Sequence, residues 1–173
     1  MASKPHTDEI YKEKRITKNP IKFKLQLNEE QKLAKEKIIN NTITLLAGSA
    51  GSGKTLLSCQ IALDGLFRRI YDKVIITRPT VSKEEIVDSC IIVDEAQNVT
   101  HEQMEMIITR IGKRSKMIIC GDDHQVDLKN KADSGFRFIY KAACKIKNLE
   151  SIKLLENHRD PIVEDLIDYY EEK

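Results

Sequence analysis

Residues 48–55 read Gly-Ser-Ala-Gly-Ser-Gly-Lys-Thr, which matches the pattern G-x-x-x-x-G-K-[ST]. This segment follows the apolar residues 43–47 and precedes a helix predicted over 54–68. A loop of this pattern between a strand and a helix cradles phosphate groups with its backbone N–H groups and the helix N-terminus. The chain is therefore predicted to contain a phosphate-binding loop, whose ligand contacts are Gly48, Ser49, Ala50, Gly51, Ser52, Gly53, Lys54, Thr55 and Leu56.

Polar residues at the ends of apolar segments supply the remaining predicted chemistry. Lys54 is expected to reach the β- and γ-phosphates, and Thr55 to bind Mg²⁺. Asp94 is expected to hold the hydration shell of the Mg²⁺, and Glu95 to orient or deprotonate an attacking water. Gln125 can sense the γ-phosphate or its water, because an amide both donates and accepts. The alternatives are an ordinary acidic strand end and an ordinary Gly-Asp-Asp turn.

Short apolar segments alternate with helical patterns along the chain. The predicted strands are 43–47, 74–77, 90–94, 117–121 and 152–155. Most of them are apolar throughout, which is typical of parallel strands covered by helices on both faces. The predicted helices are one beginning after Asn28, with Gln31 as its capping partner, and others at 54–68, 101–111 (capped by Thr100 and Gln103), 134–145 and 161–171. We therefore expect a three-layer α/β domain with a mainly parallel sheet of about five strands, and with Gly48, Asp94 and Asp122 at one edge.

Length and composition suit one globular domain, because 40% of the 173 residues are hydrophobic and 32% carry charges of mixed sign. No apolar stretch approaches the roughly 20 residues of a membrane helix, so a cytoplasmic location without a membrane partner is expected. Four widely spaced cysteines indicate neither a disulfide framework nor a metal cage. Residues 1–24 are predicted to be a basic flexible arm before a domain at 25–173; such an arm either favours nucleic acid or is simply solvated.

The connection between the second and third predicted strands is unusually short. Nine residues separate Pro79 from Ser89, whereas a crossover between parallel strands normally needs a dozen or more. Either the link is unusually tight, or residues are missing or deleted between 80 and 89. We therefore expect a chain break or an abrupt excursion between Thr80 and Ser89.

Four motifs follow one another in a recognisable order: Gly48 to Thr55, Ile76-Thr-Arg-Pro79, Val93-Asp-Glu-Ala-Gln-Asn98 and Gly121-Asp-Asp-His-Gln125. Over about residues 25–170 this order resembles the single-domain PhoH-like ATPases, which are similar to the first RecA-like domain of superfamily 1 helicases. The resemblance implies a RecA-like P-loop NTPase domain that binds and hydrolyses ATP with Mg²⁺.

The resemblance also implies roles for three further residues. Gln31 matches the adenine-reading glutamine of the helicases, alongside its role as a capping partner. Arg78 matches a motif that contacts nucleic acid, the alternative being an ion pair with a nearby carboxylate. Arg159 matches an arginine that reaches a γ-phosphate across an interface, the alternative being an interhelical ion pair. In a one-domain protein such an arginine comes from another subunit or serves its own site differently, so a homo-oligomeric ring, for example a hexamer, is implied.

PhoH-like proteins usually carry several dozen more residues before the Asp-Glu strand, which agrees with the short crossover. The expected function is an ATP hydrolase coupled to RNA or single-stranded DNA as an oligomeric helicase-like motor. The alternative is a nucleotide-dependent switch or binding module that hydrolyses slowly and unwinds nothing. A small-molecule kinase is disfavoured, because Glu95 suits the activation of water rather than of a substrate hydroxyl.

Overall fold

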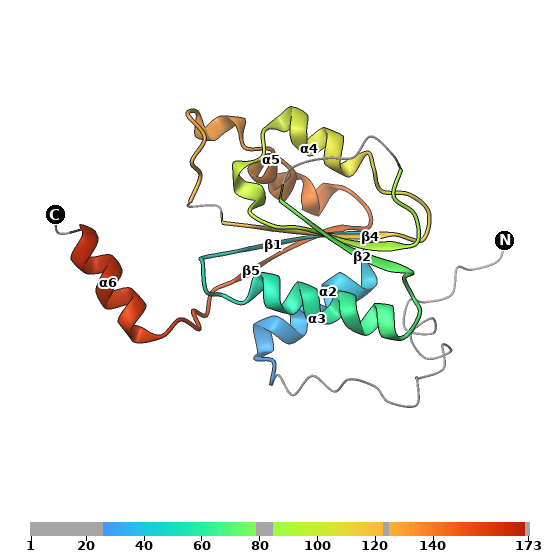
Figure 1. Cartoon of the computed structure of the whole chain (residues 1–173). Coiled ribbons are helices and arrows are strands. Elements are labelled where there is room, and N and C mark those ends of the chain that lie inside the picture. The colour runs from blue at the N-terminus through green and yellow to red at the C-terminus, as the bar shows by residue number, and fades with distance from the viewer. Residues whose placement is uncertain (1–25, 79–84, 123–124, 172–173) are drawn as a thin grey trace.

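The computed structural model of the chain describes residues 26–78, 85–122 and 125–171. Five strands form its central sheet: β1 (Ile43–Gly48), β2 (Lys73–Thr77), β3 (Ser89–Val93), β4 (Lys116–Gly121) and β5 (Leu149–Leu154). Their order across the sheet is β2-β3-β4-β1-β5, and every neighbouring pair is parallel (Figure 1). The predicted parallel sheet is confirmed, and Gly48, Asp94 and Asp122 lie at its carboxyl edge.

Helices cover both faces of this sheet. One face carries α2 (Glu29–Asn40) and α3 (Lys54–Phe67), and the other carries α4 (His101–Ile108) and α5 (Gly135–Ala142). Three short 3₁₀ helices are η1 (Ala96–Asn98), η2 (Lys131–Asp133) and η3 (Ala143–Lys145), and α6 (Pro161–Glu171) projects away from the layers (Figure 1). The three-layer α/β architecture is therefore confirmed. None of the helices in the described ranges is both long and apolar enough to span a bilayer.

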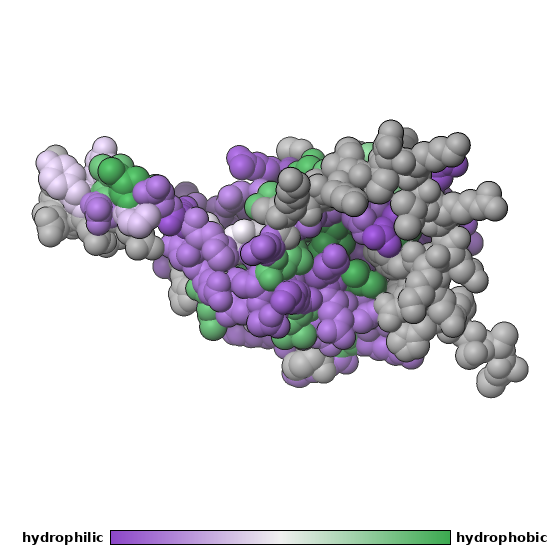
Figure 2. Space-filling model, turned by 90° about the horizontal axis from the view of Figure 1, so that it is seen from below, coloured by the Kyte–Doolittle hydropathy of each residue, from purple (hydrophilic) through white to green (hydrophobic). Residues whose placement is uncertain are grey.

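Alternation of side chains along each strand produces one hydrophobic core on each face of the sheet. Leu45 packs with Phe136 of α5 in one core, whereas Leu46, the next residue of β1, packs with Leu57 of α3 in the other. All four side chains are at most 2% exposed. Burial of such a side chain stabilises the fold by about 1.5–3 kcal/mol. The outer surface on the α2–α3 side is mostly hydrophilic, with apolar side chains in small groups (Figure 2).

Two helix starts have the capping boxes that the sequence predicts. At α2, the Gln31 N–H donates to Asn28 Oδ1 at 2.7 Å, and the Asn28 N–H donates back to Gln31 Oε1 at 3.3 Å. At α4, the Gln103 N–H donates to Thr100 Oγ1 at 3.4 Å and the Thr100 N–H donates to Gln103 Oε1 at 3.0 Å. Each box satisfies two backbone donors that the first helical turn leaves without partners.

The predicted helix over 101–111 is too long at its C-terminal end, because α4 ends at Ile108. Ile111 instead forms a parallel bridge with Ile86, and the Gly112 N–H donates to the Ile86 carbonyl at 2.8 Å. The Ile111 side chain still packs against the core. Its distance along the sequence from the apolar residues of α4 is therefore the same as in a further helical turn, although its backbone is not helical. A similar difference occurs at α5, which ends at Ala142 and continues as η3.

The last strand begins earlier than its apolar pattern predicts. β5 starts at Leu149 rather than at residue 152, and its first residues pair with Ile43 and Thr44 of β1. Polar Glu150 is accommodated because β5 is an edge strand, where its carboxylate accepts from Lys37 Nζ at 2.7 Å. The expected chain break or excursion between Thr80 and Ser89 falls largely on residues 79–84, which lie outside the described ranges, and it stays a prediction.

Candidate nucleotide-binding site

The loop between β1 and α3 has a backbone that depends on glycine. Gly51 and Gly53 have φ angles of 89° and 83°, a region that glycine adopts without steric cost. Gly53 is the N-cap of α3, so the N–H groups of the first helical turn, which lack acceptors within the helix, face the loop. Buried Ser52 donates through its hydroxyl to the Ser49 carbonyl at 2.8 Å. The loop is thus closed on itself in the arrangement that receives an anion.

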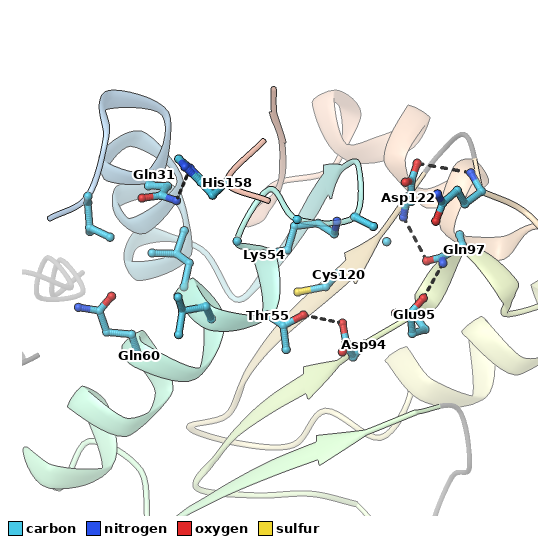
Figure 3. Close-up of a pocket in the computed structure, with 18 of the residues that line it drawn as sticks. Gln31, Lys54, Thr55, Gln60, Asp94, Glu95, Gln97, Cys120, Asp122 and His158 are labelled. Carbon is cyan, nitrogen blue, oxygen red and sulfur yellow. Dashed lines mark hydrogen bonds between the residues drawn. The ribbon is translucent and has the colours of Figure 1, made fainter. Parts of the chain in front are cut away.

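Lys54 lies over this loop. Its Nζ donates to the carbonyl oxygens of Gly48 at 2.7 Å and Ser49 at 2.8 Å. Burial lowers the pKa of Lys54, and the negative charge of Asp122 opposes that effect more than any other charge does. The ammonium is therefore placed where phosphate oxygens can replace its backbone acceptors (Figure 3).

Thr55 and Asp94 link the loop to the end of β3. The Thr55 hydroxyl donates to Asp94 Oδ1 at 2.9 Å (Figure 3). The Asp94 N–H donates to the Thr77 carbonyl at the end of β2 at 2.9 Å, which fixes the backbone that carries the carboxylate. A hydroxyl and a carboxylate oxygen are the ligand types that Mg²⁺ prefers, so this pair fits the cation that the loop implies.

Glu95 adopts an unusual backbone conformation beside this pair. Its φ and ψ angles are 56° and 34°, in the left-handed region that costs a non-glycine residue about 1–3 kcal/mol. The Glu95 side chain is exposed, and its Oε2 accepts a hydrogen bond from Gln97 Nε2 at 2.7 Å. A left-handed conformation of a non-glycine residue persists only where the surrounding contacts hold it. Here the contact is the hydrogen bond from Gln97, and both residues line the cavity.

The segment after β4 approaches the same residues. Asp122 is 5% exposed, and its N–H donates to Gln97 Oε1 at 3.1 Å. The Gln125 N–H donates to Asp122 Oδ1 at 3.4 Å, and the Gln125 side chain is exposed. Gln97 therefore connects the Glu95 carboxylate to the segment that carries Gln125 (Figure 3).

The segment after β5 covers the other side of the loop. The His158 N–H donates to the Gly51 carbonyl at 3.1 Å, and a Cβ at Gly51 would lie 2.4 Å from Arg159 Cγ. His158 Nε2 and Gln31 Nε2 are 3.4 Å apart, and the Leu155 N–H donates to a carboxylate oxygen at the start of α2 at 2.8 Å. Arg159 consequently packs against the phosphate loop of its own chain, and the preceding residue, His158, lies beside Gln31.

These elements enclose a cavity of about 570 Å³. The predicted site residues that line it are Gln31, Ala50, Gly51, Gly53, Lys54, Thr55, Leu56, Asp94, Glu95 and Gln125. Other predicted residues of the described ranges lie outside the lining: Gly48, Ser49 and Ser52 build the loop, and Arg159 packs on it. Arg78 is exposed just after β2 and also lies outside the lining.

Several lining residues have no role in the sequence-based prediction, among them Gln97, Cys120 and His158. The sequence did offer a signal for two of them. Gln97 is a polar residue two positions after Glu95, and His158 directly precedes Arg159. Burial raises the pKa of Cys120 to about 12, and its sulfur lies 3.2 Å from Ser58 Oγ. Cys120 is therefore a neutral, buried thiol in the lining of the cavity.

A parallel sheet with helices on both faces, a glycine-rich loop between β1 and α3, and carboxylates after β3 together define a RecA-like P-loop NTPase domain. A family model described as PhoH-like protein matches this chain over residues 25–88 and 85–171. The chain belongs to the PhoH-like protein family.

Curated relatives agree with this assignment. A PhoH-like protein of Synechocystis is 26% identical over 193 residues, covering 78% of this chain and 58% of that protein. A PhoH-like protein of Bacillus subtilis is 27% identical, covering 96% of this chain and 75% of the relative. The chain spans somewhat over half the length of the Synechocystis and Mycobacterium leprae relatives. The alignment with the Synechocystis protein is 193 residues long, whereas the aligned 78% of this chain amounts to only about 135 residues. Within the aligned region the relative therefore has nearly sixty residues that have no counterpart in this chain.

Solved structures share the fold. The Pif1 helicase from Candida albicans aligns with a TM-score of 0.54 and 14% identity, over 83% of this chain and 43% of that chain. Bacteroides Pif1 bound to single-stranded DNA aligns with a TM-score of 0.50 and 15% identity, over 83% of this chain and 46% of that chain. At these identities the similarity concerns the arrangement of the sheet and helices, which is that of a helicase RecA-like domain.

Proposed function

We propose that this protein is a Mg²⁺-dependent ATPase. The observation that carries the proposal is the 2.9 Å hydrogen bond between Thr55 Oγ1 and Asp94 Oδ1, because it joins the phosphate loop to the acidic end of β3 within one cavity. When Mg²⁺ is bound there, it neutralises phosphate charge and orients the β- and γ-phosphates. Thr55 would bind the cation, Asp94 would hold its hydration shell, and Lys54 would oppose the phosphate charge.

Hydrolysis requires activation of a water molecule, and Glu95 is proposed for that step. Its carboxylate is exposed at the cavity and accepts the proton of the attacking water, while Gln125 orients the water or senses the γ-phosphate. Gln31 reads the adenine edge with its amide, and neighbouring His158 flanks the base. The packing of Arg159 on its own loop supports a role for this arginine at the γ-phosphate of the same chain.

Coupling to RNA or single-stranded DNA is proposed through Arg78, which lies exposed just after β2. The fold neighbour from Bacteroides is bound to single-stranded DNA, which supports a nucleic-acid partner here. The described residues form one RecA-like domain, and we propose that a homo-oligomer, such as a ring, supplies the neighbouring domain for coupled movement.

A nucleotide-dependent switch is the second candidate. It is favoured by the shortness of the connection between β2 and β3 and by the many positions that the Synechocystis relative has and this chain lacks. A switch would bind nucleotide with the same residues and hydrolyse slowly, with no response to nucleic acid.

The test compares ATP binding and phosphate release in Lys54→Ala and Glu95→Gln. Lys54→Ala should abolish tight triphosphate binding, because it removes the phosphate counter-charge, whereas Glu95→Gln should keep binding and lose turnover. Glu105→Gln on the exposed face of α4 makes a matched chemical change away from the cavity and should behave like the wild type. Equal loss of binding in Lys54→Ala and Glu95→Gln would contradict these roles.

The two candidates differ in their response to nucleic acid. A motor should hydrolyse ATP faster when single-stranded RNA or DNA is added, and Arg78→Ala should reduce this stimulation while basal turnover stays unchanged. The mass of the assembly, measured with and without ATP and RNA, tests the oligomer. Unchanged turnover and mass would leave the switch as the function.

A further inference from the structure

The short helix η1 carries two adjacent amide side chains directly after Glu95. Gln97 is 4% exposed and makes a hydrogen bond with each end of its amide. Its Nε2 donates to Glu95 Oε2 at 2.7 Å, and its Oε1 accepts from the Asp122 N–H at 3.1 Å. One buried side chain thus connects the ends of β3 and β4 (Figure 3).

The orientation of this amide is determined by its partners. A carboxylate only accepts hydrogen bonds and a backbone N–H only donates, so the reversed amide would place like groups together at both ends. The amide therefore fits this position only when the Glu95 carboxylate and the Asp122 N–H are both in place. It specifies the distance between those two groups as well as the direction of the carboxylate.

Asn98 makes an equivalent connection further along the same segment. Its Nδ2 donates to Asp127 Oδ2 at 3.0 Å, and its Oδ1 accepts from the Asp127 N–H at 2.8 Å. Gln97 and Asn98 therefore hold Asp122 and Asp127, the residues on either side of Gln125. The described residues that precede and follow Gln125 are thus each attached to η1.

The helix η1 is itself anchored to the start of α5, which lies on the same side of the sheet. The Ser134 hydroxyl donates to the Gln97 carbonyl at 2.9 Å, and the Gly135 N–H at the start of α5 donates to the Val99 carbonyl at 2.8 Å. Ser134 is 1% exposed and its backbone pairs with Thr100. The two amides thus extend from a support that packing holds in place.

We infer that Gln97 is a positioning residue for hydrolysis, which, with Asn98, holds the Glu95 carboxylate and the Gln125 segment in one fixed relation to the γ-phosphate. This inference rests on the proposed ATPase function. A group that only positions other groups for the reaction contributes in the transition state and little to ground-state binding. Its loss should therefore lower kcat and leave nucleotide affinity nearly unchanged.

The test measures kcat at saturating Mg-ATP and the dissociation constant of a non-hydrolysable ATP analogue. Gln97→Met keeps the length of the side chain and removes both hydrogen bonds; it should lower kcat about tenfold to a hundredfold and change the dissociation constant less than about threefold. Gln97→Glu keeps an acceptor for the Asp122 N–H but places a second carboxylate beside Glu95, so its loss of kcat should be at least as large.

A double-mutant cycle tests whether Gln97 acts through the segment that carries Gln125. Gln97→Met should cost less kcat in a Gln125→Ala background than in the wild type, because that background has already lost the positioned amide. Fully additive losses, or a Gln97→Met enzyme with kcat within about threefold of the wild type, would overturn the inference. A loss of nucleotide affinity as large as the loss of kcat would also overturn it, since that outcome indicates a structural role in the cavity.

Wild-type turnover separates this inference from the function on which it rests. Absence of ATP hydrolysis by the wild type would refute the proposed function, whereas normal wild-type turnover with an unaffected Gln97→Met enzyme would refute the inference alone. Thermal unfolding shows whether each variant folds. If Gln97→Met does not fold, the partly exposed Asn98→Ala decides: a lower kcat with retained affinity supports the inference, and unchanged kcat overturns it.

Discussion

Lys116 has a buried ammonium at the edge of the sheet opposite the nucleotide cavity, and this ammonium makes stability depend on pH. Lys116 is 7% exposed, and its Nζ donates to the carbonyl oxygens of Ile38, Ile39 and Asn41 at the end of α2. These carbonyls lack donors within the helix, and a positive charge at a helix C-terminus is favourable. Burial nevertheless lowers the pKa of Lys116 to about 8, with a smaller opposing effect from Cys90.

The direction of the effect follows from which state binds the proton. Below pH 8 both the folded and the unfolded chain bind it, and above 10.5, the ordinary pKa, neither does. Between these values the unfolded chain binds more protons, so the free energy of unfolding rises with pH. The difference between 10.5 and about 8 corresponds to about 3 kcal/mol, most of it gained by pH 10.

Two buried thiols act in the opposite direction. Burial raises the pKa values of Cys90 and Cys120 to about 12, so the folded chain retains protons that the unfolded chain loses above pH 9. Their contribution to stability therefore falls as the pH rises through that range. The wild-type curve alone combines both slopes, and only a comparison with a variant isolates Lys116.

The assay is urea unfolding of wild type and Lys116→Met at four pH values from 7 to 10 under reducing conditions. The free energy of unfolding of the wild type, minus that of the variant, should increase by about 2.5 kcal/mol across this range. This difference reports on Lys116, because both proteins contain the cysteines and their contributions largely cancel in the subtraction. Lys113→Met, at a nearby exposed lysine, should give a curve parallel to the wild type. Parallel curves for wild type and Lys116→Met would refute the assigned protonation of this side chain.

Three further substitutions test the fold and the loop. Asn28→Ala should lower the free energy of unfolding by about 1 kcal/mol in urea, because it removes the N-cap of α2; a change below about 0.3 kcal/mol would contradict that role. Phe136→Ala should lower it by about 3–5 kcal/mol, since the ring is fully buried, and a smaller loss would show that the site collapses around the cavity. Gly51→Ala should weaken nucleotide binding measured by titration, because its Cβ would displace Arg159 and its φ of 89° disfavours alanine; wild-type affinity would show that the segment after β5 moves freely.

The parallel sheet could be predicted because its central strands are short apolar runs between turn residues. Residues such as Ile91 and Ile92 bury side chains on opposite faces, and only a sheet with two covered faces accommodates that pattern. The ends of the elements were less predictable. Ile111 continues a helical spacing but contacts the core from an extended backbone, so hydrophobic periodicity alone does not distinguish the two conformations.

The phosphate loop and its acidic partners could be proposed because each lies in a short contiguous motif. The contacts that complete the cavity join distant positions: Gln31 meets His158 across 127 residues, and Gln97 meets Asp122 across 25. The left-handed backbone of Glu95 also has no signal in its residue type. Such features depend on which strands are neighbours, and strand order was not predictable from the motifs.

Strand order explains why Asp122 connects the two halves of the site. β4 lies between β1, which carries the phosphate loop, and β3, which carries Asp94 and Glu95. The residue that follows β4 is consequently close to both. The Asp122 carboxylate is the charge that most opposes the lowering of the Lys54 pKa, while its backbone N–H contacts Gln97 and, through it, Glu95. Asp122 is therefore placed between Lys54 and Glu95, which follow two strands, β1 and β3, that are not neighbours in the sheet.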